Sequence, residues 1–143
     1  MKKTTVPKRI LVINDTQEIL ELFSDILHEE MGFEVVLDSY KPHMLDIIKQ
    51  VNPDLIISDH VFGEEKIAWQ LLQRLKMDRD TAQIPVIICS AAIKDLKEME
   101  GYLTSKDVGV LYKPFEVDEL INLVNEKLKE ARDPTLHHGS ELK

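Results

Sequence analysis

Cysteine is almost absent from this 143-residue chain. Cys89 is the only one, so no disulfide can form within the chain. It follows the apolar residues Val86, Ile87 and Ile88, which is typical of a buried small side chain rather than a reactive thiol. A reducing compartment, the cytoplasm, is therefore expected.

The chain also lacks a long apolar run near its N-terminus. Its basic start, Met1-Lys2-Lys3, leads into an apolar run that covers only residues 10–13 and stops at Asn14 and Asp15. Such a run is too short for the core of a signal peptide or for a membrane span. We therefore expect neither secretion nor membrane insertion.

The chain has fewer basic than acidic residues: 18 Lys and Arg against 26 Asp and Glu, which gives a net charge of −8. This balance argues against binding of nucleic acid or of an anionic membrane surface. A phosphate held near acidic residues would need a cation between them. The glycine-rich patterns G-x-x-x-x-G-K-[ST] and G-x-G-x-x-G are absent too, so nucleotide binding has no support.

What the chain does contain is a regular alternation of short apolar strands and helical patterns. Strands are expected at 10–13, 33–37, 55–59, 84–89 and 108–112, and helices at 19–31, 42–51, 68–75, 93–103 and 116–132. This alternation predicts an α/β fold, a five-stranded parallel sheet with helices on both faces. We expect one domain over residues 8–132 and a frayed or disordered tail at 133–143.

Polar residues follow four of the expected strands: Asp15, Asp59, Ser90 and Lys113. In a parallel sheet these positions share the edge at which ligands bind. Two carboxylates placed together repel unless a cation lies between them, and ligands that are all oxygen favour Mg²⁺. A hydroxyl and an ammonium suit the oxygens of a phosphoryl group. The pattern therefore indicates a carboxylate nucleophile, with a metal and a lysine absorbing phosphoryl charge.

This set of segments resembles the receiver domain of two-component response regulators. The matching segments are 10–15, 53–59, 85–91 and 113–115. Each is unspecific alone, but the four in this order and spacing are a strong signal. The resemblance implies a CheY-like, flavodoxin-like fold with strand order 2-1-3-4-5.

The resemblance implies a Mg²⁺ site around the third strand. Asp15, Asp59 and the backbone carbonyl of Val61 would be its ligands. The family usually has two acids after the first strand, and here the first is Asn14, which would reach the ion through a bound water. The pocket carries one charge fewer, so weaker attraction of Mg²⁺ is expected.

The resemblance makes Asp59 the phosphoacceptor. Ser90 would meet the phosphoryl group, and Lys113 would pair with its oxygens next to a cis Lys113-Pro114 bond. The family usually places Tyr or Phe three residues before this lysine, where the ring reorients on activation. Here Val110 holds that position, so the chemistry is better supported than the usual switch.

The function implied is acceptance of a phosphoryl group from a histidine kinase or phosphotransfer protein. The phosphorylated domain would signal to a separate downstream protein through a surface change near the last helix and strand. Its only chemistry would be its own phosphorylation and dephosphorylation. A stand-alone cytoplasmic protein is expected, although a domain cut from a longer protein fits equally well, and a homodimer through the last helix is open.

Two other interpretations differ in kind. A receiver-like interaction module that is not phosphorylated is favoured by Asn14 and Val110, and Mg²⁺ binding would discriminate it. An aspartyl-phosphate phosphatase would need a second Asp two residues after the nucleophile, but Val61 stands there.

Overall fold

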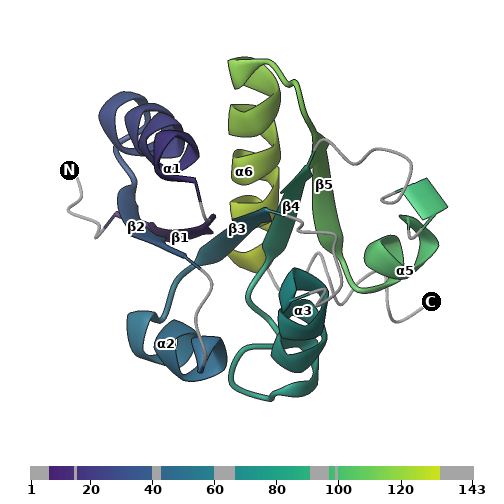
Figure 1. Cartoon of the computed structure of the whole chain (residues 1–143). Helices are drawn as coiled ribbons and strands as arrows, with labels where there is room; N and C mark the ends of the chain where they lie inside the picture. The colour runs from purple at the N-terminus through teal and green to yellow at the C-terminus, as the bar shows by residue number, and fades with distance from the viewer. Residues whose placement is uncertain are drawn as a thin grey trace.

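A computed structural model describes residues 7–14, 16–39, 43–59, 67–90, 97–98 and 100–132. Five strands form one parallel sheet in the order β2-β1-β3-β4-β5 (Figure 1). The strands are β1 (Arg9–Ile13), β2 (Glu34–Asp38), β3 (Leu55–Asp59), β4 (Val86–Ser90) and β5 (Val108–Tyr112). The expected strand order is confirmed, and no strand boundary lies more than two residues from the expected one.

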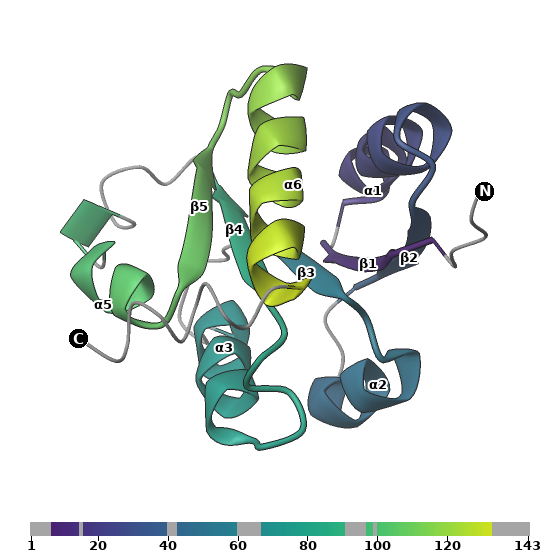
Figure 2. The same cartoon turned by 180° about the vertical axis from the view of Figure 1, so that it is seen from behind.

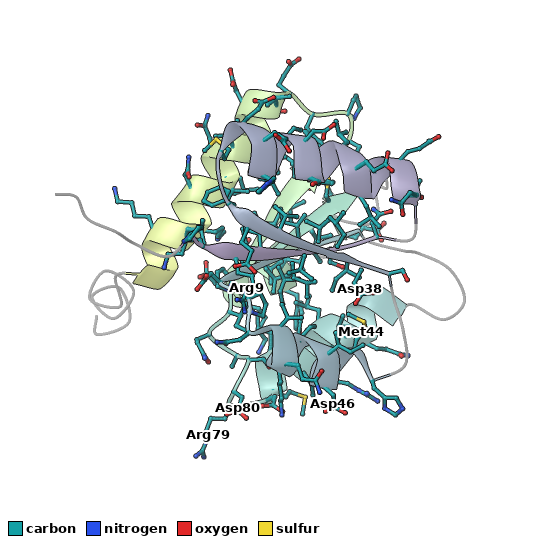
Figure 3. All side chains as sticks on the ribbon, turned by 90° about the vertical axis from the view of Figure 1, so that its left-hand side faces the viewer. Arg9, Asp38, Met44, Asp46, Arg79 and Asp80 are labelled. Carbon is teal, nitrogen blue, oxygen red and sulfur yellow. The ribbon has the colours of Figure 1, made fainter. Side chains whose placement is uncertain are left out.

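Helices cover both faces of the sheet. They are α1 (Gln17–Ser24), the π-helical η1 (Asp25–Glu30), α2 (Met44–Val51), α3 (Ile67–Met77), α5 (Glu100–Ser105) and α6 (Val117–Arg132). Residues of α1, η1 and α6 pack on one face, and residues of α2, α3 and α5 pack on the other. Figure 2 shows the sheet from behind with α6 in front of it, and Figure 3 shows α1 above the sheet and α2 below it.

The apolar runs of the central strands follow from this double cover. In β1, Ile10 and Val12 belong to the core under α1 and α6, whereas Leu11 and Ile13 belong to the opposite core. All four are at most 1% exposed. A strand buried on both faces has no solvated position at which a polar side chain would be favoured.

The first helix changes its hydrogen bonding in the middle. Residues 17–24 are α-helical and Asp25–Glu30 are π-helical. Gly32 then turns the chain with a φ of 79°, and its N–H donates to the His28 carbonyl at 3.0 Å. Gly32 ends this helix, since glycine adopts positive φ without steric cost.

An ion pair holds the start of β5 against α6. Lys127 Nζ lies 3.1 Å from Asp107 Oδ1, and the Lys127 side chain is only 10% exposed. Its aliphatic stem passes Gly109, where an added Cβ would lie 3.1 Å from Lys127 Cε. The absence of a side chain at Gly109 therefore leaves room for the lysine.

Some expectations fall on undescribed residues. The helix expected at 93–103 is helical at 97–98 and in α5, while 91–96 and 99 lie outside the description, as does the tail at 133–143. Among the described helices, none combines the length and the apolar character that crossing a membrane requires.

Candidate functional site

The carboxyl ends of β1, β3, β4 and β5 share one edge of the sheet, because neighbouring strands run parallel. Ile13 pairs with Ser58, so Asn14 and Asp59 take the next positions on neighbouring strands. Neighbouring strands lie about 4.8 Å apart. The backbone therefore brings these two positions side by side.

The same edge continues toward β5. Asp59 pairs with Cys89, Ser90 pairs with Tyr112, and Lys113 follows directly. Asp59, Ser90 and Lys113 thus come from three consecutive strands, as the sequence led us to expect. The structure describes the backbone of Asp59 and Ser90 but not their side chains, so the chemical roles of both remain predictions.

Asp59 ends the central strand of the sheet. Leu55, Ile56 and Ile57 before it are at most 1% exposed, and Ser58 is 7% exposed. Residues packed on both sides hold such a strand in one place. The position of the candidate acceptor is therefore set by the core rather than by a surface loop.

Asn14 is the polar residue whose contacts at this edge are best described. Its side-chain Oδ1 accepts a hydrogen bond from the Thr16 N–H at 2.8 Å, a turn that leads into α1. Its backbone N–H donates to the carbonyl of Asp38, the last residue of β2, at 3.0 Å. Asp38 is labelled in Figure 3. Asn14 is 4% exposed, and these two hydrogen bonds hold both its side chain and its backbone in place.

The loop after β5 is anchored by an aromatic contact. The Lys113-Pro114 bond is cis, as the resemblance implied. Phe115 packs on the core under α1 and α6, and its ring centroid lies 6.0 Å from that of Phe23 in α1. This contact ties the lysine-bearing loop to the helix that begins after Asn14.

The neighbourhood of Ser90 includes an aromatic ring that sequence reasoning did not place. Val110 and Tyr112 both pack on the core under α2, α3 and α5. The Lys97 ammonium lies 5.9 Å from the centroid of the Tyr112 ring, within cation–π range. Sequence periodicity could not have found this pair, because it joins a strand residue to a separate segment.

Two of the expected ligands, Asp15 and the carbonyl of Val61, lie outside the described residues. Among the side chains that are described, no group of three or more His, Cys, Asp or Glu could hold a metal. The expected Mg²⁺ ligands are nevertheless all oxygen donors, and the register places Asp59 beside the end of β1, which Asp15 follows. The donor set therefore fits a hard cation.

Comparison with known proteins identifies the family. Residues 10–125 match the model of the response regulator receiver domain. The chain belongs to this family. Receiver domains are signalling domains of two-component systems. The family match agrees with the parallel sheet and with the polar residues at its carboxyl edge.

Among curated proteins, the chain is 33% identical over 137 residues to the "DNA-binding dual master transcriptional regulator RpaA" of Synechocystis sp., covering 94% of this chain and 55% of that protein. The chain spans about half the length of this relative and of the next two, at 52% and 54%. It is also 28% identical to the "Polar-differentiation response regulator DivK" of Brucella anthropi, covering 88% of this chain and 100% of that protein.

Solved structures show the same fold. The chemotaxis response regulator CheY4 of Vibrio cholerae has a TM-score of 0.70 at 21% identity, covering 86% of this chain and 99% of that one. The receiver domain of the Francisella response regulator 1452 has a TM-score of 0.71 at 29% identity, covering 86% and 98%.

Proposed function

We propose that this receiver domain accepts a phosphoryl group on Asp59 from the phosphohistidine of a histidine kinase or phosphotransfer protein. The observation that carries the proposal is the register, which sets Asp59 at the end of the central strand beside the positions of Asn14 and Ser90. A carboxylate oxygen of Asp59 attacks phosphorus, and a P–O bond forms as the P–N bond breaks. The imidazole nitrogen leaves with the bonding electrons and takes up a proton.

Two further side chains would bind the transferred group. The Lys113 ammonium pairs with phosphoryl oxygens, and the Ser90 hydroxyl donates a hydrogen bond to one of them. Phe115 supports this arrangement indirectly, because its packing on Phe23 anchors the loop that follows the lysine.

Asp15, Asp59 and the Val61 carbonyl would hold Mg²⁺. When bound there, Mg²⁺ would offset the negative charge of the carboxylates and the phosphoryl oxygens. The aspartates themselves supply the charge that attracts it. Asn14 leaves this set with one carboxylate fewer than the family usually has.

The phosphorylated domain would signal rather than act on a small substrate. We place the change at the surface around β5 and α6, where it would alter binding of a separate downstream protein or pairing with a second copy. The cytoplasm is the compartment in which we expect this exchange.

Intact-protein mass after incubation with acetyl phosphate and Mg²⁺ tests the proposal. The native chain should gain one phosphoryl group, and Asp59→Asn should gain none. Asp46→Asn, at an exposed acid of α2, is the matched control and should be modified like the native chain. Equal modification of Asp59→Asn would contradict the assignment.

A second candidate is an interaction module of the same fold that is not phosphorylated. Asn14 and Val110 favour it, because they replace a usual acid and the usual aromatic residue. Titration with Mg²⁺ separates the two functions. The phosphoacceptor must bind the ion at millimolar concentration or better, whereas a module that has lost the chemistry need not.

A further inference from the structure

Asn14 has polar atoms that the fold does not use. Its Oδ1 faces the Thr16 N–H, and because that backbone group can only donate, the oxygen rather than the amide nitrogen must lie there. The Nδ2 group is thereby turned away from Thr16. Within the described part of the chain, neither of its N–H groups has a hydrogen-bond partner.

The amide nitrogen of Asn14 reaches the surface of the carboxyl edge. Asn14 is 4% exposed as a residue, but among the described residues Arg9 Nε is the only fully buried side-chain nitrogen or oxygen without a hydrogen-bond partner, so Nδ2 stays accessible to a ligand. Its place is the carboxyl edge, next in register to Asp59. An acceptor supplied there, such as a phosphoryl oxygen on the neighbouring strand, would satisfy the unused donors.

We propose that Asn14 presents its amide nitrogen to the phosphoryl group on Asp59 and acts as an anion-binding residue rather than as a cation-binding one. The inference rests on the proposed function of Asp59. It assigns Asn14 a role opposite to that of the acid usual at this position, since a carboxylate attracts the cation and repels phosphoryl oxygens. The usual carboxylate would stabilise the phosphoryl group indirectly, by helping to bind Mg²⁺. A hydrogen bond from the Asn14 amide to the phosphoryl group replaces part of that stabilisation.

Two variants of Asn14 separate the donor from the fold. Asn14→Asp keeps an oxygen that can accept from Thr16 N–H, but it removes both donors and adds a charge. Asn14→Ser also keeps an acceptor for that N–H, in the equivalent serine turn, and adds no charge; its one hydroxyl donor lies nearer the backbone than the amide nitrogen does. Thermal unfolding of both variants checks that the turn into α1 survives.

The probe is beryllofluoride, a stable stand-in for the phosphoryl group, titrated at saturating Mg²⁺ and followed by NMR of the ¹⁵N-labelled chain. Both variants should bind it at least about tenfold more weakly, the effect of losing one hydrogen bond to a charged group. Mg²⁺ titrated alone should bind Asn14→Asp more tightly than the native chain and Asn14→Ser equally well. The side-chain amide resonances of Asn14, assigned by their loss in the variants, should shift when beryllofluoride binds.

The opposite pattern would overturn the inference. If Asn14 acts on the cation through a water, Asn14→Ser weakens Mg²⁺ binding and Asn14→Asp strengthens binding of both Mg²⁺ and beryllofluoride. Native-like beryllofluoride affinity in both variants also contradicts it. The acetyl phosphate experiment on the native chain is run beside these titrations: failure there removes the proposed function itself, whereas success there with native-like variants removes only the role of Asn14.

Discussion

Replacing Asp107 by Asn should destabilise the protein, because it removes a carboxylate that pairs with the nearly buried ammonium of Lys127. The Lys127 side chain is 10% exposed and Asp107 is 49% exposed, with 3.1 Å between Nζ and Oδ1. Breaking a fully buried pair costs about 3–5 kcal/mol and an exposed pair about 0.2–1 kcal/mol, so a loss of about 2 kcal/mol is expected. Asparagine tolerates the φ of 60° at this position, so the backbone is not strained by the change.

The matching change on α6 should cost less. Lys127→Met keeps most of the aliphatic stem beside Gly109 and removes the ammonium, whose burial is unfavourable in itself. In the Lys127→Met background, Asp107→Asn should cost under about 0.5 kcal/mol, because its partner is already gone. This small remaining cost in unfolding free energy reflects the attraction between Asp107 and the ammonium of Lys76.

Urea unfolding of the four proteins in this cycle measures the coupling free energy. A coupling of about 1.5 kcal/mol is expected, with unchanged dependence on urea concentration. If Asp107→Asn cost the same in both backgrounds, the ion pair would not be what holds the start of β5 to α6.

Two further predictions concern the same end of the molecule. Burial lowers the pKa of the Lys76 ammonium below its ordinary value, so the unfolded chain binds more protons than the folded one. The cost of burying this charge is therefore full at neutral pH and fades as the pH rises from the folded pKa toward the unfolded one. Lys76→Met should therefore raise the midpoint of thermal unfolding at pH 7, and raise it by less at pH 10. The control Lys129→Met, at an exposed lysine, should show no such dependence on pH. A lowered midpoint for Lys76→Met at pH 7 would contradict the prediction. Gly109→Ala should cost about 1–2 kcal/mol in urea, because its Cβ crowds Lys127 and Ile87. The control Gly101→Ala, with open space around its Cβ and a helical backbone, should instead stabilise by about 0.5–1 kcal/mol, and gains at both glycines would refute the crowding at β5.

The sequence predicted the sheet better than the contacts beneath it. The strand Leu55–Asp59 was recognisable because a strand covered on both faces is apolar at consecutive positions, a pattern that local sequence carries. The ends of the strands then followed, and with them the meeting of Asp59, Ser90 and Lys113 at one edge.

Contacts between separate elements were not accessible in this way. Lys127 reads in sequence as one of several basic residues complementing the end of a helix dipole, yet it is buried against Asp107 twenty positions earlier. The π-helical segment Asp25–Glu30 was also missed, because its apolar residues fit an ordinary helical period.

The most direct test of the account is to locate the phosphoryl group. The chain is treated with acetyl phosphate and Mg²⁺, and borohydride then reduces any acyl phosphate to homoserine, which peptide sequencing by mass spectrometry can place. We predict homoserine at position 59 and at no other acid. Homoserine at a different acid, such as Asp54 before the same strand, or its absence from a chain that has gained a phosphoryl group, would contradict it.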